Sequence, residues 1–338
     1  MYSFKDDYSE LGHERVFTDL LKISNQQLAS YGLDSVSRDA KKLIQKRFAL
    51  KNADIHFISG GTQTNAVFCK AVLSSIEAVI SADSSHICVR ECGAVEYGGN
   101  KILTAKNKDG KLMPCDIERI CAENSHEHTV KPKLVIISQA TETGTVYTKQ
   151  ELKSLYEVCK NQNLYFYIDG ARIGAALTCN GADVKCEDYG NLCDAFYIGG
   201  TKNGSPLGEA LCIINNNLKQ NFRYFLKQHG ALLSKSGLIG SCFKTLFNND
   251  LFFELATHAN AMAQKLANAF IKKGYKLYSN SPTNQIFPIL PNQKITEFQK
   301  HFEFYVWKKL DDNNSVVRLV CSWAAKEDEV DKLIGMFK

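Results

Sequence analysis

One lysine of this sequence stands in a glycine-rich segment, where a solvated surface lysine would be unusual. Lys202 lies in YIGGTKNGSPLGEA, residues 197–210, directly after the apolar run DAFYI. Glycines allow a backbone and a ligand to approach one another closely. Lys202 is therefore a candidate for an amine that meets a bound molecule. The alternative is a solvated turn, and the other polar motifs of the chain have to decide between the two.

Two more polar motifs follow strand-like runs upstream of Lys202. SGGTQTN, residues 59–65, is a Gly-rich turn before a helical pattern, and the free amides of a helix start attract anions. The turn lacks the spacing of a dinucleotide fingerprint or a P-loop, and an ordinary helix cap by Thr62 explains it equally well. Asp169 ends the apolar run YFYI, where a buried acid must be paired, although Asp before Gly is also common in turns. Arg172, three residues later, can hold an anion from the same turn.

The order of these motifs indicates one kind of cofactor. A phosphate-binding turn, an acid at a strand end and a lysine at the next strand end are what a pyridoxal 5'-phosphate (PLP) site needs. In such a site the lysine forms a Schiff base with the aldehyde, and the acid keeps the pyridine nitrogen protonated. The sequence therefore predicts that Lys202 is confined because its amine must meet an aldehyde.

Strand-like apolar runs alternate with longer helical patterns over most of the chain. This alternation predicts an α/β fold with a mostly parallel sheet, in which ligand groups gather at the carboxyl ends of the strands. A long amphipathic helix that ends at Gly274 then leads to strand-like runs of a smaller α+β unit. We place the boundary so that residues 1–248 form an N-terminal arm and the large domain, and residues 249–338 form the small domain. The expected strands are ADIHFIS, EAVISA, KPKLVIISQA, NLYFYID, CDAFYIGG and GEALCIIN, followed by NQIFPILP, FEFYVWKKL and SVVRLVCSW.

The composition argues against several classes of protein. A net charge of +5 without a basic block gives little support to nucleic-acid binding. No apolar run is long enough for a bilayer, and the N-terminus has no apolar signal core, so we expect no membrane association. Twelve scattered cysteines are expected as reduced thiols of a cytoplasmic protein. No metal is expected: His86, Cys88 and Cys92 lack the second ligand pair of a zinc site, and His126 and His128 lie in a polar stretch that is typical of solvated loop histidines.

The motifs also resemble those of a known family, in the same order and nearly end to end. They are similar to the threonine aldolase/β-eliminating lyase family of PLP-dependent enzymes, closest to the branch labelled low-specificity L-threonine aldolase. The resemblance implies fold type I, the aspartate-aminotransferase-like fold, with a mostly parallel seven-stranded sheet flanked by helices and a small C-terminal α+β domain. It implies a lyase that cleaves L-threonine or L-allo-threonine to glycine and an aldehyde. The matching motifs are FKDDYSE, SYGLD, SGGTQTN, SADSSHICVRECGAVEYGG, YIDGARIGAAL, GGTKNG, GALLSKSG, SPTNQIFPILP and VVRLVCSW.

The resemblance also implies roles for residues around the cofactor. Lys202 resembles the Schiff-base lysine, and Asp169 resembles the partner of the pyridine nitrogen. His86 matches a histidine whose ring stacks on the cofactor, although a loop histidine is the reading that the sequence alone would favour. Gly61 and Thr62 match the turn that binds the phosphate group of the cofactor in this family, and Thr201 matches a hydroxyl residue that contacts the same group.

The substrate is expected to meet arginines and a second subunit. Arg172 resembles a residue that contacts both the cofactor and the substrate carboxylate. Arg318, in VVRLV, matches an arginine that clamps the α-carboxylate, and its apolar neighbours weaken the alternative of a surface arginine. Tyr31, in SYGLD, resembles a residue that the neighbouring subunit offers. The resemblance therefore implies a homodimer or homotetramer with shared sites.

Three positions depart from the family pattern. Glu142, in ATETGTV, takes the place of a histidine that is a candidate general base, so either His86 or Glu142 could remove the proton of the β-hydroxyl group. Asp6, in KDDY, stands where a serine helps to bind the carboxylate, so that contact does not transfer. Lys235, in LLSKSG, lies one residue out of register with a phosphate-contacting arginine and is a candidate anion ligand only.

Two other functions remain open from the sequence. One is another PLP reaction on amino acids, such as β-elimination, because one fold hosts many chemistries. The other is a PLP-binding regulatory protein without turnover. The intact set of Lys202, Asp169 and Arg318 argues against the second, because a pure binder has no need of a lysine that bonds to the cofactor.

Overall fold

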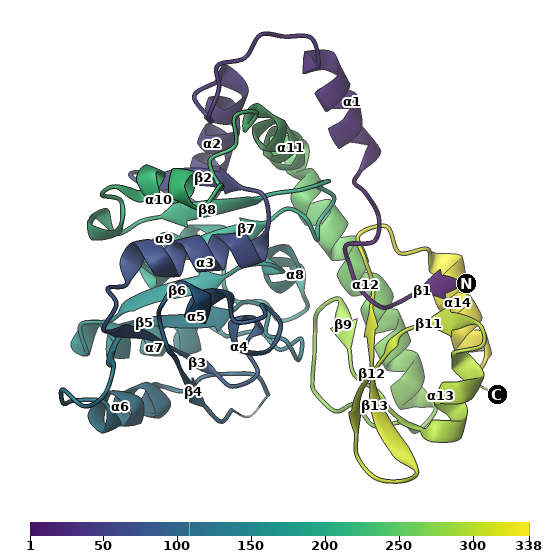
Figure 1. Cartoon of the computed structure of the whole chain (residues 1–338). Coiled ribbons are helices and arrows are strands. Elements are labelled where there is room, and N and C mark those ends of the chain that lie inside the picture. The colour runs from purple at the N-terminus through teal and green to yellow at the C-terminus, as the bar shows by residue number, and fades with distance from the viewer. Residues whose placement is uncertain (108, 338) are drawn as a thin grey trace.

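The chain folds into a large unit built on a wide sheet and a smaller unit at its side (Figure 1). The computed structural model describes residues 1–107 and 109–337. The wide sheet has seven strands in the order β2-β8-β7-β6-β5-β3-β4. All neighbouring pairs are parallel except those of β8, which runs antiparallel to both β2 and β7. The predicted mostly parallel α/β sheet is confirmed. Its strands are β2 (Asp54–Ile58), β3 (Glu77–Ala82), β4 (Ile102–Ala105), β5 (Lys131–Ser138), β6 (Tyr165–Asp169), β7 (Ala195–Gly199) and β8 (Glu209–Ile213).

The central strands are apolar along their whole length because helices cover both faces of the sheet. Side chains alternate between the two faces of a strand. On β5, Leu134 and Ile136 join a core with α3, α5 and α10, whereas Val135 and Ile137 join the core on the opposite face. The helices of the large unit are α2 (Ser35–Arg47), α3 (Gly61–Val72), α4 (His86–Val89), α5 (Ala94–Tyr97), α6 (Pro114–Glu123), α7 (Lys149–Asn161), α8 (Ile173–Thr178), α9 (Tyr189–Leu192), α10 (Phe222–Gln228) and α11 (Gly237–Phe247).

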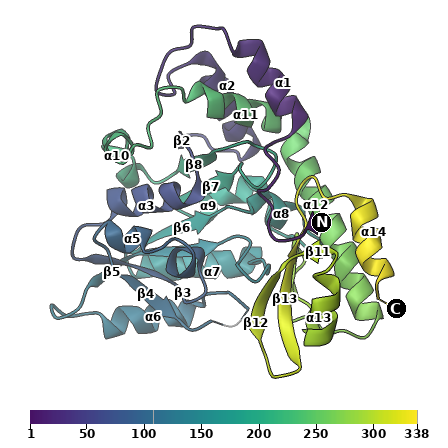
Figure 2. The same ribbon diagram turned by 45° about the vertical axis from the view of Figure 1, so that its right-hand side comes forward.

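The smaller unit packs an antiparallel sheet against the long helix α12 (Leu251–Lys272). Figure 2 shows this sheet on one side of α12, with α13 and α14 beside it. The sheet order is β10-β13-β12, and β9 pairs with β13. The remaining bounds are β9 (Gln285–Ile286), β10 (Ile289–Pro291), α13 (Asn292–Phe298), β11 (Phe302–Glu303), β12 (Tyr305–Lys309), β13 (Asn314–Val320) and α14 (Glu327–Gly335).

The N-terminal arm joins the small unit rather than the large sheet. Strand β1 (Tyr2–Ser3) pairs in parallel with β11, and Phe4 is fully buried in the core of the small unit. The arm then leads to α1 (Glu14–Ile23), which lies against α11. Conversely, Leu251 and Phe252 at the start of α12 belong to the core of the large unit. The predicted domain boundary between residues 248 and 249 stays a proposal. Helix α12 contributes side chains to the cores of both units.

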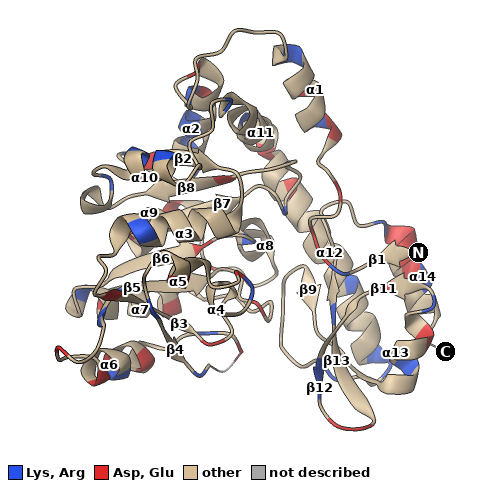
Figure 3. Ribbon diagram, in the orientation of Figure 1, with Lys and Arg blue, Asp and Glu red and all other residues tan. Residues whose placement is uncertain are grey.

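Charged side chains are spread over both units, and Figure 3 shows basic and acidic residues interspersed along the helices. Within the described residues, none of the helices combines the length and the apolar character that a bilayer crossing requires. The described residues also contain no group of three or more histidine, cysteine, aspartate or glutamate side chains that could hold a metal ion.

Candidate active site

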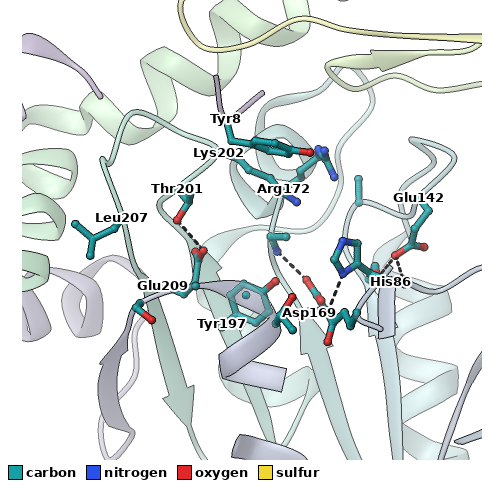
Figure 4. Close-up of a pocket in the computed structure, with 18 of the residues that line it drawn as sticks. Tyr8, His86, Glu142, Asp169, Arg172, Tyr197, Thr201, Lys202, Leu207 and Glu209 are labelled. Carbon is teal, nitrogen blue, oxygen red and sulfur yellow. Dashed lines mark hydrogen bonds and ion pairs between the residues drawn. The ribbon is translucent and has the colours of Figure 1, made fainter. Parts of the chain in front are cut away.

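Two adjoining cavities open at the carboxyl ends of the parallel strands. The first, of about 480 Å³, lies over the ends of β2, β6 and β7 (Figure 4). The second, of about 420 Å³, lies between the large unit and strands β12 and β13 of the small unit. Five residues line both cavities, and all of them except Tyr8 belong to the predicted site: Tyr8, His86, Glu142, Arg172 and Lys202.

Most of the residues predicted from the sequence lie in these cavities, and two do not. Gly61, Thr62, Asp169 and Thr201 line the first cavity, and Arg318 lines the second. Tyr31 and Lys235 are described but line neither cavity. They lie close together on the surface, because the Tyr31 amide donates to the carbonyl of Ser234, 3.1 Å away.

The backbone around Lys202 requires the glycines seen in the sequence. A Cβ atom at Gly200 would lie 2.6 Å from the carbonyl oxygen of Gly208, and Gly204 has a φ of +90°. The turn therefore holds Lys202 directly after β7, where the residue is half-buried and lines both cavities. Burial, followed by the positive charge of Arg172, lowers the pKa of Lys202. A lysine with a lowered pKa has more neutral, nucleophilic amine near neutral pH.

Asp169 is held as a buried carboxylate at the end of β6. The amide of Ala171 donates to Oδ1 at 3.0 Å, and Asn65 Nδ2 donates to Oδ2 at 2.9 Å. These two donors fix the orientation of the carboxyl group, and the residue is only 3% exposed. Asp169 is therefore an acceptor fixed in place for a cationic partner in the cavity.

A chain of hydrogen bonds joins Asp169 to His86. Asn65 Nδ2 also donates to Glu91 Oε1 at 2.9 Å, and the same oxygen lies 2.8 Å from His86 Nδ1. The Tyr167 hydroxyl group donates to Asn65 Oδ1 and fixes the orientation of the amide. When Nδ1 carries the proton shared with Glu91, Nε2 of His86 is the acceptor. The network thus orients the His86 ring and selects its tautomer.

Arg172 is paired with an acid from the N-terminal arm. Nε and Nη2 of Arg172 donate to the two carboxylate oxygens of Asp7 at 2.7 and 3.0 Å, and Asn284 Nδ2 also donates to Oδ2. Burial opposes ionisation, but the charges of Arg172 and Lys202 hold the pKa of Asp7 below its ordinary value. The bidentate pair fixes the plane of the guanidinium group. Nη1 of Arg172 has no hydrogen-bond partner among the described residues, so it can donate to a ligand.

Asp6, which replaces a serine of the family pattern, has a local role. Its Oδ1 accepts hydrogen bonds from the Tyr8 amide at 3.1 Å and the Ser9 hydroxyl group at 2.8 Å. Asp6 therefore caps a turn of the arm, and its neighbour Asp7 supplies the carboxylate that enters the site.

Arg318, on β13, has an unused donor beside the second cavity. Nη2 donates to the carbonyl oxygen of Lys5 at 2.8 Å, whereas Nε is buried without a partner among the described residues. The guanidinium carbon lies 5.5 Å from the Tyr305 ring and 5.3 Å from the Trp307 ring. Burial, followed by the charge of Arg172, lowers the pKa of Arg318. Because a buried donor without a partner is costly, this site favours an anionic ligand.

Glu142 lies in the loop after β5, beside His86. Its Oε1 accepts hydrogen bonds from the Ser138 hydroxyl group at 2.6 Å and from the amide of His86 at 2.9 Å. Burial raises the pKa of Glu142, the Ser138 hydrogen bond opposes this, and the charge of Asp169 adds to the increase. A carboxyl group of this kind can exchange a proton closer to neutral pH than an ordinary glutamate can.

Helix α3 begins at the floor of the first cavity. Its N-cap is Gly60, which excludes the alternative that Thr62 is the N-cap. A Cβ atom at Gly61 would lie 3.0 Å from the Tyr197 hydroxyl oxygen, so the close approach needs glycine. The first amides of a helix have no internal partners and attract anions. This glycine cradle, the acceptor Asp169 and the amine of Lys202 match a phosphorylated, cationic aldehyde, so the residues fit PLP.

Sequence reasoning missed four residues that shape the site: Asp7, Asn65, Glu91 and Glu209. Asp7 and Asn65 lie inside motifs that were singled out: Asp7 is next to Asp6, and Asn65 is the last residue of SGGTQTN. Glu91 follows His86 in HICVREC, and Glu209 begins the expected strand GEALCIIN. Only Glu209 carries a signal in the sequence, as an acid directly beside an apolar run, whereas Asp7, Asn65 and Glu91 carry none.

Comparisons with known proteins agree with this geometry. The sequence model of the family described as "Beta-eliminating lyase" matches residues 22–292. A "Low specificity L-threonine aldolase" from a Pseudomonas species is 30% identical over 332 residues, which cover 97% of this chain and 94% of the relative. The structure of a Leishmania major threonine aldolase is 43% identical, with a TM-score of 0.98 over 100% of this chain and 98% of that chain. An aspartate aminotransferase from Thermus thermophilus has a TM-score of 0.72 at 15% identity, covering 99% of this chain and 90% of that one, and so shares the fold.

Proposed function

Because this chain belongs to the β-eliminating lyase family, we propose that it is a PLP-dependent aldehyde-lyase that cleaves L-threonine to glycine and an aldehyde. Its architecture is fold type I of the PLP-dependent enzymes. One observation carries the proposal: the amine of Lys202, the acceptor Asp169 and two arginines line the joined cavities. Within the described residues, both arginines, Arg172 and Arg318, have an unused donor.

The first cavity has a place for each part of the cofactor. The turn of residues 59–62 and Thr201 would hold the phosphate group, and Asp169 would hold the ring nitrogen. His86 lines the same cavity and would cover the ring, and Lys202 would bond to the aldehyde carbon. When bound, PLP supplies the electron sink for the pair of electrons released as the Cα–Cβ bond breaks.

The second cavity suits the amino-acid substrate. Arg318 Nε and Arg172 Nη1 are the donors that would bind the α-carboxylate group, and the bond from Arg172 to Asp7 keeps its guanidinium group in one orientation. Two fixed cations give the substrate one orientation in the site. The β-hydroxyl group then has to meet a proton acceptor on the large unit.

His86 and Glu142 are the two candidate acceptors of that proton. Both hydrogen bonds to Glu142 end on Oε1, so Oε2 is the oxygen that would take the proton of the β-hydroxyl group. The raised pKa of Glu142 suits proton transfer near neutral pH. His86 Nε2 is the other acceptor, because Nδ1 is bonded to Glu91. Cleavage leaves an aldehyde, and a proton delivered to Cα completes glycine.

A product assay tests this function directly. The holoenzyme is incubated with L-threonine and with L-allo-threonine, and glycine and acetaldehyde are measured together. We expect the two products in equal amounts. Formation of a keto acid and ammonia instead would indicate β-elimination, and the aldehyde-lyase assignment would then be wrong.

We also propose that the chain works as a homodimer or homotetramer. Tyr31 and Lys235 lie together outside the cavities of their own chain, and the Tyr31 side chain is 37% exposed. This position suits residues that are offered to the site of a neighbouring copy. Sedimentation velocity gives the number of chains, and a monomer would contradict the proposal.

A cytoplasmic location completes the proposal. Among the described residues, all cysteines are free thiols, which is typical of a reducing compartment. Fractionation of cells that express the protein tests this placement.

A further inference from the structure

Glu209 lies between the two turns that would hold the phosphate group of the cofactor. It begins β8, where it pairs with Ile58 on β2 and with Gly199 on β7. The turn of residues 59–62 follows the first of these partners, and Thr201 follows the second. Glu209 lines the first cavity, and Figure 4 shows its side chain beside Thr201 and Tyr197. A carboxyl group therefore stands where an anion is expected to bind.

The hydrogen bonds of Glu209 compete with that anion. The Gly200 amide donates to Oε2 at 2.8 Å, and the Thr201 hydroxyl group donates to Oε1 at 2.9 Å. A threonine hydroxyl group has a single proton to donate. While Thr201 donates to an ionised Glu209, it offers only lone pairs to the cavity, and a phosphate dianion cannot accept from them. A protonated Glu209 could donate to Thr201 Oγ1 instead, which would release the Thr201 proton for the phosphate.

Charges on the neighbouring elements act in both directions. Burial raises the pKa of Glu209 to about 7, the hydrogen bonds from Thr201 and Gly200 and the charge of Lys202 oppose this, and the charge of Asp169 adds to it. Tyr167 and Tyr197, on β6 and β7, also face this group, and their own pKa values are raised, first by burial. A bound phosphate dianion would place a further negative charge beside Glu209 and favour the protonated form.

We infer that Glu209 takes up one proton when the phosphate group binds, and that this proton turns the Thr201 hydroxyl group from Glu209 toward the phosphate. The inference rests on the proposed PLP site. Glu209 is then a binding residue that couples cofactor affinity to pH. One O–H bond forms on the Glu209 carboxyl group with a proton from solvent, and all other changes are in hydrogen bonds.

The test compares the cofactor affinity of the wild-type holoenzyme with that of Glu209→Gln as a function of pH. Glutamine can donate to Thr201 as the protonated acid would, but it cannot ionise. The dissociation constant of PLP is measured by dilution of the holoenzyme, from the absorbance of the bound cofactor. Groups without a charge interaction with Glu209 titrate equally in both proteins, so their contribution cancels in the ratio of the two dissociation constants. Thr201→Ser keeps the hydroxyl group and serves as the matched control for Thr201→Val, which removes it.

In the cofactor-free protein Glu209 ionises above about pH 7. Above this pH, the dissociation constant of PLP for the wild type should rise relative to that for Glu209→Gln by about tenfold per pH unit. Thr201→Ser should keep this dependence, and Thr201→Val should weaken cofactor binding in the wild-type and in the Glu209→Gln background. A ratio that stays constant from about pH 7 to about pH 9 would overturn the inference, as would much weaker binding in Glu209→Gln at about pH 7.

A second measurement decides the matter even when Glu209→Gln does not fold. The infrared spectrum of the wild-type holoenzyme at about pH 8 should contain the C=O stretch of a buried protonated carboxyl group that the cofactor-free protein lacks at this pH. Its absence would overturn the inference. A protein that binds no PLP would overturn the proposed function together with this inference, whereas a flat affinity ratio leaves the proposed function intact.

Discussion

The Asp7–Arg172 pair offers a perturbation whose size follows from burial. Asp7→Asn keeps the shape of the side chain and removes its charge. The side chains of Asp7 and Arg172 are 1% and 12% exposed, so solvent screens the pair little. Removing one partner of a buried ion pair leaves the other charge uncompensated and costs about 3–5 kcal/mol. We therefore expect the free energy of unfolding to fall by about 3–5 kcal/mol at neutral pH.

The pH dependence of this loss gives a second check on its sign. The pKa of Asp7 is lower in the folded protein than its ordinary value, because Arg172, Lys202 and hydrogen bonds outweigh burial. The stabilisation is therefore present above the ordinary carboxyl pKa of about 3.9 and is lost as the pH falls toward the folded value. The difference between wild type and Asp7→Asn should shrink below about pH 4.

Urea denaturation of the wild type, Asp7→Asn and a matched control is the assay. The control is Asp6→Asn, because asparagine keeps the oxygen that caps this exposed turn, so the change should alter stability by only about 0.5 kcal/mol. The KM for L-threonine should rise in Asp7→Asn, because Arg172 loses the partner that fixes its guanidinium plane. A destabilisation of Asp7→Asn no larger than that of the control would refute the reasoning.

Three substitutions test the roles of other site residues. Asp169→Asn should keep the fold and lose most turnover, because the carboxylate that holds the ring nitrogen protonated is gone; a near-normal kcat would make Asp169 a structural cap only. Arg318→Lys should retain the cofactor absorbance while kcat/KM falls, since lysine lacks the fork that binds a carboxylate; weaker cofactor binding with unchanged kcat/KM would contradict this. Glu142→Gln should slow L-threonine cleavage by at least ~100-fold with the cofactor spectrum unchanged, whereas undiminished cleavage would assign the proton transfer to His86.

The sequence predicted the parts of the site that follow strands. Asp169 and Lys202 each come directly after an apolar run that folds as a buried strand, and parallel strands bring such ends to one edge. The glycines around Lys202 marked a turn that admits no side chains. The position of these residues followed from local pattern and the general geometry of parallel sheets.

The residues that the sequence did not predict depend on contacts between distant segments. Asp7 meets Arg172 across 165 positions, and Asn65 meets Asp169 across 104. The pairing of β1 with β11 brings the first residues of the chain beside residue 302. A single sequence gives no signal for such pairs, because their register comes from packing of the two units. The short helix α13 was missed for another reason: its seven residues are too few for a clear helical period.

The central claim is that Lys202 bonds to PLP in the first cavity, and borohydride reduction tests it most directly. The holoenzyme is reduced, digested and mapped by mass spectrometry, with Lys235 as an internal control because it is exposed and lines neither cavity. The account predicts one pyridoxyl group per chain on the peptide that contains Lys202, and loss of this label in Lys202→Ala. A pyridoxyl group on another lysine, or labelling that persists in Lys202→Ala at the same stoichiometry, would contradict the account.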